Sequence, residues 1–144
     1  MTTVNAYLTF NGNCEEAFNF YKSIFGGEFA FISKFSEMPE DPKFKLTEEE
    51  KNRVLHCSFP ISEHTVLMGS DTGGDWASDF AIGTNVSISI NTDSKEEADR
   101  LFNSLSAGGK VIFPIRDTFW DSYFGSFTDK FGVQWMVSFD APRG

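Results

Sequence analysis

The chain of 144 residues has few basic residues, few cysteines and no long apolar run. Its 12 lysines and arginines are outnumbered by 21 aspartates and glutamates, giving a formal net charge of −9, and they are scattered rather than clustered. A surface of this sign repels polyanions, so we expect no nucleic-acid partner. No apolar run approaches the roughly 18 residues of a membrane span, and the N-terminus lacks a basic region followed by an apolar stretch. We therefore expect no membrane partner and a cytoplasmic location.

Only two cysteines are present, Cys14 and Cys57, and their spacing matches no metal-binding pattern. They fall in a helix-like and a strand-like segment, which favours two buried, reduced thiols. Neither has an evident activating base nearby in the sequence. A catalytic thiol is therefore not expected.

Phenylalanine, in contrast, is abundant, with 17 copies in a chain that is 40% hydrophobic and 23% charged. This composition and length are typical of a single globular domain with a sizeable core. Aromatic side chains bury a large area each, so the chain has enough rings to fill a core and to line a pocket as well.

Two segments share one helical design. In "NCEEAFNFYKSIFGG", Asn13 can cap a helix, Glu16 can complete a capping box, and apolar residues follow at helical spacing before two glycines. In "DSKEEADRLFNSLSAGG", Ser94 and Glu97 repeat the pattern. The sequence predicts amphipathic helices near 13–25 and 94–107.

Each predicted helix lies between strand-like runs, and each copy then continues into a hairpin. The order is strand, helix and three strands, written twice, over modules at about 1–72 and 84–140. This predicts an α+β fold of two βαβββ modules within one domain, 1–144. The proline-rich and charged stretch 36–52 is expected to be a surface excursion with one helical turn.

The chain contains the stretches "YLTFNGNCEEAFNFYKSIFGGEF", "SEMP", "VLMGSD", "TFW" and "FGSFTDKFGVQWM". Together these stretches resemble the PhnB-like branch of the vicinal oxygen chelate superfamily, which has the glyoxalase and bleomycin-resistance fold. The resemblance covers nearly the whole chain. It implies a cupped, mixed sheet of eight strands with helices outside, a cavity inside, and a homodimer. Branch members are often labelled as methyltransferases of a ubiquinone precursor. We do not expect that chemistry, because the glycine-rich turn of a usual methyl-donor site is absent.

Strand alternation assigns side chains to two faces. Val86, Ile88 and Ile90 are expected to pack against a helix, as are Leu8 and Phe10, and Leu55, Cys57 and Phe59. Trp135, Phe127 and Phe131 are expected in the core or in a turn closed by Gly132. Trp120 and Phe124 would form a lip. The predicted ligand-binding residues are Tyr7, Thr9, His56, Ser58, Met68, Asn85, Ser87, Trp120, Phe124, Gln134 and Met136.

The family's metal-dependent members place four ligands on cavity-facing strands, and by register these positions fall near Asn5 or Ala6, Met68, Asn85 and Met136. None is a histidine or a carboxylate, the donors that hard or borderline dications require. We expect no metal and no other cofactor.

Three functions remain open from the sequence. The first is a metal-independent protein that binds an unknown small molecule. The second is an isomerase, lyase or dioxygenase type of enzyme in which His56 acts as acid or base, with Tyr7 or Asn85 polarising a carbonyl. The third is an interaction protein with a filled cavity. A histidine among strand residues is more often a hydrogen-bonded structural residue than a catalyst, although the inward direction expected for His56 favours a functional role, so whether the chain is an enzyme stays undecided. His64, beside a hairpin turn, is expected to be exposed.

Overall fold

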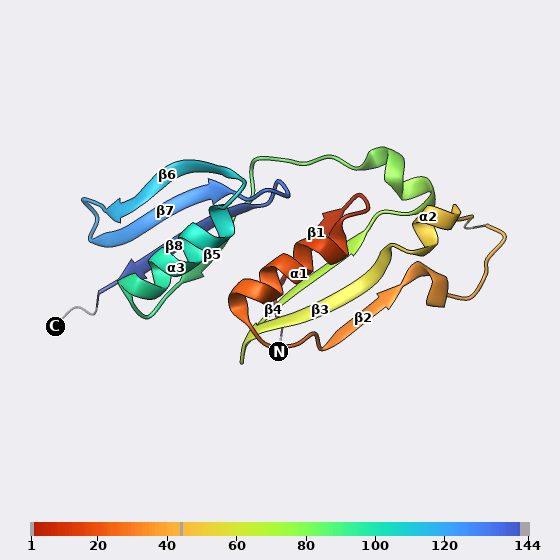
Figure 1. Ribbon diagram of the computed structural model, residues 1–144, viewed down its shortest axis with the longest axis horizontal. Helices are drawn as coiled ribbons and strands as arrows, with labels where there is room; N and C mark the ends of the chain where they lie inside the picture. The colour runs from red at the N-terminus through yellow and green to blue at the C-terminus, as the bar shows by residue number, and fades with distance from the viewer. Residues whose placement is uncertain (1, 44, 142–144) are drawn as a thin grey trace. The chain divides into compact units, whose positions relative to one another are not determined.

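A computed structural model describes residues 2–43 and 45–141, and side chains at all of these except 75–77. The chain forms two compact units, Met1–Ala81 (unit 1) and Ile82–Gly144 (unit 2). Figure 1 shows that each unit has its own sheet and its own long helix. No helix among the described residues is both long and apolar enough to span a membrane. The prediction of one domain over 1–144 stays a prediction.

Unit 1 contains one long helix and four strands. In chain order they are β1 (Ala6–Phe10), α1 (Cys14–Phe25), β2 (Phe31–Lys34), β3 (Val54–Ser62) and β4 (Thr65–Asp71). The sheet order is β1-β4-β3-β2, in which β1 runs parallel to β4 and the other pairs are antiparallel.

Unit 2 repeats this arrangement. Its elements are β5 (Ile88–Asn91), α3 (Lys95–Ser106), β6 (Lys110–Asp117), β7 (Ser122–Thr128) and β8 (Gln134–Asp140). The sheet order is β5-β8-β7-β6, again with one parallel pair, β5 and β8. The predicted fold class, α+β with two βαβββ modules, is confirmed, and each module forms a four-stranded mixed sheet. Both helices lie within one residue of their predicted ends.

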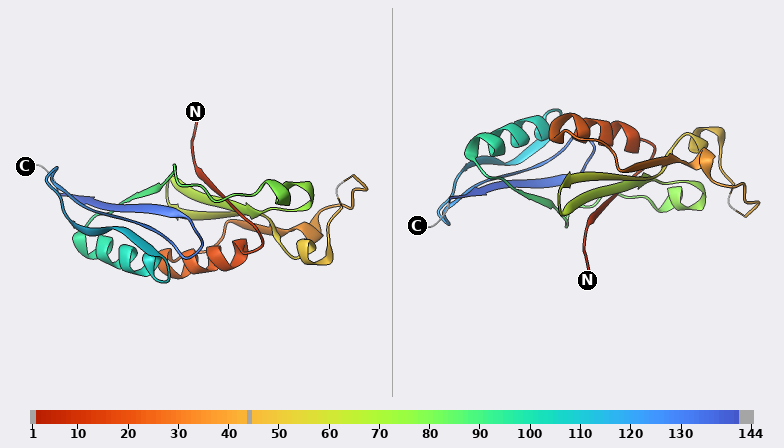
Figure 2. Two further views of the ribbon diagram at one scale, coloured as in Figure 1. Left: turned by 90° about the horizontal axis from the view of Figure 1, so that it is seen from above. Right: turned by 90° about the horizontal axis from the view of Figure 1, so that it is seen from below.

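Each helix packs along one face of the sheet of its own unit (Figure 2). The contact is close enough to require glycine in the strand beneath. A Cβ at Gly69 of β4 would lie 2.5 Å from the ring of Phe18, and one at Gly125 of β7 would lie 2.7 Å from the ring of Phe102. The same device therefore seats a helical phenylalanine in both units. The residues buried around these contacts include Phe10, Ala17, Tyr21, Cys57, Phe59 and Leu67 in unit 1, and Ala98, Leu101, Leu105, Phe127, Trp135 and Val137 in unit 2.

The N-terminus of α1 is capped differently from the prediction. Asn13 precedes the helix, but its side chain makes no capping hydrogen bond. The buried carboxylate of Asp71, at the end of β4, does so instead: its Oδ1 accepts from the backbone N–H groups of Gly12 (2.8 Å) and Cys14 (2.9 Å). Its Oδ2 accepts from the N–H of Val54 at 2.9 Å. The predicted Asn13–Glu16 capping box was wrong because Asp71, 57 positions after Cys14, accepts from the backbone at the start of the helix.

The N-terminus of α3 follows the prediction. The side chain of Ser94 accepts a hydrogen bond from the N–H of Glu97 at 3.1 Å. The Glu97 carboxylate pairs with Arg100, and this hydrogen bond is the main reason its pKa is lowered.

The excursion between β2 and β3 contains a 3₁₀ turn, η1 (Phe35–Glu37), and the single helical turn expected there, α2 (Glu48–Lys51). Thr47 and Glu50 form a capping box at α2. The other oxygen of Glu50 accepts from the N–H of Gly74 at 2.8 Å, at the start of the 3₁₀ helix η2 (Gly74–Asp79). These bonds from backbone N–H groups hold the pKa of Glu50 below its usual value. The excursion is thus attached to the segment that follows β4.

The turn between β7 and β8 is organised by the buried carboxylate of Asp129. Its Oδ1 accepts from the N–H groups of Phe131 (2.9 Å) and Val133 (3.0 Å), and its Oδ2 accepts from the indole Nε1 of Trp135 at 2.8 Å. Gly132 has φ +91°, a conformation that glycine adopts without strain. Because Trp135 and Phe127 are buried, the core role predicted for these rings is confirmed.

One strand starts later than its sequence suggests. Residues 85–87 precede β5, and Val86 is 76% exposed rather than packed against a helix. The alternation prediction was wrong there because β8 pairs with β5 only from Ile88 onward. Leu55 is also only partly buried, and Val54 is buried in its place, where the pairing of β2 with β3 shifts register.

Candidate functional site

The face of the unit 1 sheet opposite α1 carries most of the predicted polar residues. Tyr7 pairs with Met68 across β1 and β4, and Met68 pairs with Ser58 of β3. Ser58 in turn pairs with Phe31 of the edge strand β2. These four side chains form a row on one face, because paired residues point to the same side of a sheet. Thr9 lies on the same face as Tyr7.

His56 lies beside this row and contacts two aromatic rings. Its ring stacks on Tyr7, with centroids 5.7 Å apart and planes at 23°, and it lies 6.0 Å from the ring of Phe31. The Tyr7 hydroxyl is 3.3 Å from Nδ1 of His56. Tyr7 is 47% exposed and Phe31 53% exposed, so the cluster is accessible. We call Tyr7, Phe31 and His56 the His56 cluster.

The His56 cluster has a defined chemistry. In the neutral ring, Nδ1 can accept the Tyr7 proton while Nε2 carries a hydrogen. Within the described residues, Nε2 has no hydrogen-bond partner. One imidazole nitrogen is thus oriented by tyrosine and the other is available to a ligand, between aromatic surfaces that suit a flat or apolar group.

The face of the unit 2 sheet opposite α3 is different in character. Met136 pairs with Ser89 and with Ser126. Gln134 lies on this face too, but its Nε2 donates to the carbonyl of Gly83 at 3.1 Å. The sheet face itself therefore offers small hydroxyls and a thioether.

At one end of this face lies an aromatic group. Trp120, in the β6–β7 turn, is 5.9 Å from the ring of Phe124, and Phe124 is 5.6 Å from Phe113 of β6. Arg116 places its guanidinium 4.6 Å from the centre of the Phe113 ring. Phe113, Arg116, Trp120 and Phe124 are called the aromatic–arginine cluster below.

The structure brings five predicted ligand-binding residues together in unit 1 and separates the other six into three groups in unit 2, one of which is Gln134 and Met136 on β8. Trp120 and Phe124 are in contact, whereas Asn85 and Ser87 lie in the exposed segment before β5. In order of element, the predicted residues are Tyr7 and Thr9 on β1; His56 and Ser58 on β3; Met68 on β4; Asn85 and Ser87 before β5; Trp120 before β7; Phe124 on β7; and Gln134 and Met136 on β8.

Sequence reasoning missed three members of these clusters. Phe31 lies in a strand-like run in which successive side chains point to opposite faces. Alternation alone could not place Phe31 on the face that carries Tyr7, because this depends on the pairing of Phe31 with Ser58. Phe113 and Arg116 are three positions apart and would not share a face in a regular strand. They do so here because β6 shifts register against β7 between them.

Metal-dependent members of the superfamily hold their metal at four strand positions. The residues at these positions in this chain do not fit a metal ion. Met68 and Met136 offer thioethers, which suit soft metals, and Asn85 and the Asn5–Ala6 position offer at most neutral oxygens. Over 2–43 and 45–141, no group of three or more His, Cys, Asp or Glu is arranged to hold an ion. The donors at these positions therefore do not fit a hard or borderline dication.

The cysteines are buried as expected. Cys14 of α1 and Cys57 of β3 have Sγ atoms 3.9 Å apart, and both side chains are fully buried. The hydrogen bond between the thiols, followed by burial, raises the pKa of Cys14. A neutral thiol is a poor nucleophile, so this pair belongs to the packing of α1.

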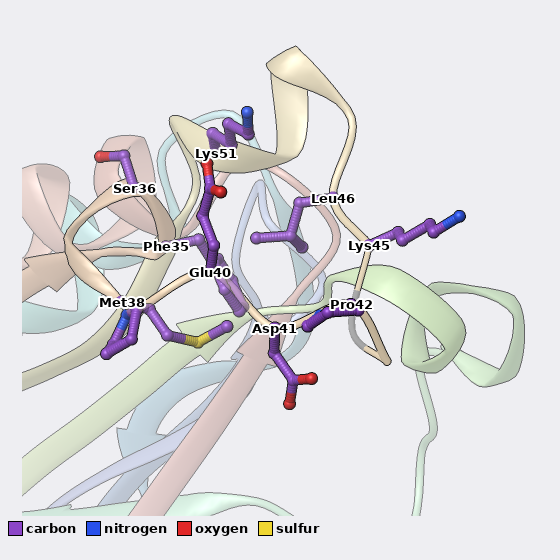
Figure 3. A pocket seen from close by; sticks show the side chains of 10 residues that line it. Phe35, Ser36, Met38, Glu40, Asp41, Pro42, Lys45, Leu46 and Lys51 are labelled. Carbon is purple, nitrogen blue, oxygen red and sulfur yellow. The ribbon is translucent and has the colours of Figure 1, made fainter.

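A pocket of about 570 Å³ lies within the excursion (Figure 3). Phe35, Met38 and Leu46 supply apolar surface, and the side chain of Lys45 points away from the hollow. The rest of the lining is Ser36, Pro39, Glu40, Asp41, Pro42 and Lys51. None of the predicted ligand-binding residues lines it.

Residues 2–138 match the model of a protein family described as 3-demethylubiquinone-9 3-methyltransferase. The chain belongs to this family. The PhnB-like branch predicted from the sequence agrees with a similar structure, described as a putative 3-demethylubiquinone-9 3-methyltransferase, PhnB protein, from Bacillus cereus. That protein is 27% identical, with a TM-score of 0.75, over 96% of this chain and 99% of its own.

Two further relatives cover nearly the whole chain. Protein PA1353 from Pseudomonas aeruginosa is 38% identical with a TM-score of 0.82, over 97% of this chain and 98% of its own. Protein YjdN from Escherichia coli (strain K12) is 28% identical over 94% of this chain and 93% of its own. A glyoxalase/bleomycin resistance protein/dioxygenase family enzyme from Burkholderia phytofirmans shares the fold, at 13% identity and a TM-score of 0.59 over 96% of this chain and 100% of its own.

Proposed function

We propose that this protein binds a small molecule without a metal, through the sheet faces that the long helices leave uncovered. The observation that carries the proposal is the His56 cluster, in which a half-exposed tyrosine both stacks on an imidazole and lies 3.3 Å from its Nδ1. Ligand sites typically combine apolar and aromatic surface with a few oriented polar groups. The cluster has this composition.

The neighbouring residues support the proposal. Ser58 and Thr9 add hydroxyls and Met68 adds a flexible apolar side chain on the same face. In unit 2, Ser89, Ser126 and Met136 repeat this mixture. A sheet face that carries serine, threonine and methionine can orient a ligand by hydrogen bonds and adapt to its shape.

Methyl transfer, named in the family description, is not part of the proposal. A usual methyl-donor site places the ligand on the N–H groups of a glycine-rich turn before a helix. At α1 those groups, on Gly12 and Cys14, are already bound to Asp71. At α3, Ser94 caps the helix. Both helix N-termini have protein partners.

A second candidate is an enzyme in which His56 transfers a proton. The contact between the Tyr7 hydroxyl and Nδ1 favours it, because a tyrosine can orient the imidazole and relay a proton. Tyr7, rather than Asn85, is the polar group in contact with this histidine. Tyr7→Phe separates the two functions: it would lower turnover if the relay operates and leave ligand affinity nearly unchanged.

The test uses the two histidines as internal reporters. His64 lies in the β3–β4 turn with a side chain 88% exposed, so its ring signals serve as the control. We expect some compounds of a small-molecule screen to shift the ¹³C–¹H signals of the His56 ring and not those of His64. Tyr7→Leu should abolish these shifts, whereas Glu63→Gln should not. Shifts in both rings, or in neither across the screen, would count against binding at this cluster.

We further propose that the protein is a homodimer. The edge strand β6 exposes Val111 and Ile112, and uncovered apolar sheet edges favour pairing with another chain. Light scattering at micromolar concentration should give twice the chain mass of 16.2 kDa. A species of the single-chain mass alone would refute this.

A further inference from the structure

The aromatic–arginine cluster of unit 2 has a combination of properties that the proposed function does not specify. Of the three arginines in the described part of the chain, Arg53 pairs with Glu49 and Arg100 pairs with Glu97. Arg116 is exposed and, among the described residues, has no carboxylate partner. In a chain of net charge −9, such an arginine is a notable exception.

The guanidinium of Arg116 makes a contact of its own. Its central carbon lies over the Phe113 ring, 4.6 Å from the ring centre, which is a cation–π contact. A planar guanidinium can bind a carboxylate through two parallel hydrogen bonds. The contact with Phe113 restricts the side chain before any anion arrives, which lowers the entropic cost of binding.

Beside the guanidinium lies aromatic surface. The ring of Phe124 is 5.6 Å from that of Phe113 and 5.9 Å from that of Trp120, and Trp120 is 47% exposed. The three rings are inclined to one another rather than parallel, so they present both faces and edges. Such a surface favours a planar ring over a saturated one, because offset and edge-to-face contacts add to simple burial.

The turn that carries Trp120 is closed by its own hydrogen bonds. Thr118 donates to the carbonyl of Ser122 from both its N–H (3.0 Å) and its Oγ1 (2.6 Å), and the N–H of Asp121 donates to the carbonyl of Thr118 at 3.3 Å. Asp121, with φ +64°, is the only described residue other than glycine with positive φ. Backbone held in a disfavoured conformation is typical of segments that position functional side chains.

Two carboxylates lie near the cluster in sequence. Asp117 is neutralised by Lys95, whose Nζ is 3.1 Å from its Oδ1. Asp121 is exposed at the turn and is therefore screened by solvent. Neither carboxylate therefore occupies the guanidinium of Arg116 in place of an anionic ligand.

We propose that the aromatic–arginine cluster binds a small planar organic anion, an aromatic or conjugated ring that carries a carboxylate, with the ring on Phe124 and Trp120 and the carboxylate on Arg116. This rests on the proposed function for the general claim that the chain binds small molecules, and it adds the chemical class. It does not require the His56 cluster.

The experiment is a calorimetric titration with 2-naphthoate, and with two matched compounds that each lack one feature. 2-Naphthamide keeps the rings without the charge, and cyclohexanecarboxylate keeps the charge without the planar ring. We expect 2-naphthoate to bind with a dissociation constant of about 1 mM or tighter. Each matched compound should bind at least about fivefold more weakly, and added salt should weaken the naphthoate complex.

Arg116→Gln should weaken naphthoate binding about tenfold, and Arg116→Lys by less, because a lysine keeps the charge and loses the planar edge. The control is Arg100→Gln, which removes the same charge from the same unit at a paired arginine and should leave affinity within twofold. Phe124→Leu should weaken naphthoate and have little effect on cyclohexanecarboxylate. Unchanged melting curves will show that the variants at the exposed residues Arg100 and Arg116 and at the half-buried Phe124 fold.

The inference is overturned if naphthoate does not bind, if naphthamide binds equally well, or if Arg116→Gln and Arg100→Gln behave alike. Its failure is distinct from failure of the proposed function. If neutral compounds shift the His56 ring signals while naphthoate does not bind, small-molecule binding stands and the anion site falls. If naphthoate binds through Arg116 and no compound shifts the His56 signals, the anion site stands and the His56 cluster loses its role.

Discussion

Units 1 and 2 have the same strand order and the same helix length, yet each relies on a different buried carboxylate. In unit 1, Asp71 lies at the end of the last strand and binds the start of α1 and the start of β3. In unit 2, Asp129 lies in the turn before the last strand and binds that turn and Trp135. In unit 2 the pairing of β5 with β8 ends at Ser138, whose side chain lies on the sheet face opposite α3 and bonds to Asn91 at 2.7 Å. The same topology therefore holds a buried carboxylate at the end of the last strand in unit 1 and just before the last strand in unit 2.

The comparison shows that the backbone determines which N–H groups need a hydrogen-bond acceptor. A side chain that is distant in the sequence can supply that acceptor. An α-helix leaves its first N–H groups unsatisfied, and a sharp turn does the same. In unit 2 the helix is capped locally by Ser94, so a remote carboxylate is not required there. In unit 1 the local residue Asn13 does not cap, and Asp71 does.

The largest expected effect comes from Asp71→Asn. The amide keeps the volume but can accept at only one of its two ends, so an N–H group of Val54 or of the helix start loses its partner, and the favourable charge at the helix N-terminus is lost. We expect the free energy of unfolding to fall by about 3 kcal/mol, measured by urea denaturation. Ser138→Ala, which removes the hydrogen bond to Asn91 where the pairing of β5 with β8 ends, should cost about 1 kcal/mol. Equal costs would mean that Asp71 and Ser138 do not differ as described.

Next comes Asp129→Asn, which would turn an amide N–H toward the indole N–H of Trp135 or toward the turn. We expect a loss of about 2 kcal/mol. In a Trp135→Phe background, where the indole donor is absent, the same change should cost about 1 kcal/mol less, as a double-mutant cycle would reveal. Strict additivity of the two changes would show that the bond between Asp129 and Trp135 contributes nothing.

A smaller contrast concerns the local caps. Ser94→Ala removes the side-chain acceptor for the N–H of Glu97 and should destabilise the protein by about 1 kcal/mol. Asn13→Ala removes no capping bond and should cost less than about 0.5 kcal/mol. Denaturation curves of the two variants decide the matter, and a reversed order would contradict the assignment of Asp71 as the cap of α1.

The smallest effect concerns Tyr123 of unit 2, whose hydroxyl donates to Asp99 at 2.6 Å. That hydrogen bond, with some burial, raises the pKa of Tyr123 to about 12. Because the pKa is higher in the folded chain than the ordinary value of about 10, the bond stabilises the fold fully below that pH. Its contribution is lost as the pH rises from about 10 to about 12.

Spectrophotometric titration near 295 nm tests this. Tyr123→Phe should remove a component that titrates near pH 12, and Asp99→Asn should move it toward 10. Tyr7→Phe, the control in unit 1, should leave that component in place. Its survival in Tyr123→Phe would assign it to another residue.

Short-range patterns were enough to predict the repeated module. The two helices follow from apolar residues at helical spacing and from glycines at their ends, and the hairpins follow from turn residues between strand-like runs. The core roles of Trp135 and Phe127 follow from alternation. The predictions about Val86 and Asn13 failed because strand pairing and the contact with Asp71 override local preference.

For the candidate sites, residue type and strand alternation are enough to predict that His56, Tyr7 and Met68 share one face of a sheet. They do not predict that Tyr7 stacks on His56, because this depends on which strands are neighbours and in what register. Likewise, Phe113 and Arg116 share a face only because β6 shifts register against β7.

The sequence by itself determined the order of elements, the amphipathic faces and the scarcity of metal-binding donors at the family's ligand positions, since each of these depends on neighbours within a few residues or on residue type alone. The tertiary structure alone decided which carboxylate caps α1, which rings contact His56, and which of the described arginines lies on an aromatic ring without an acidic partner. These contacts join residues on different elements, and the pairing of strands and the packing of helices on sheets set the distances between them.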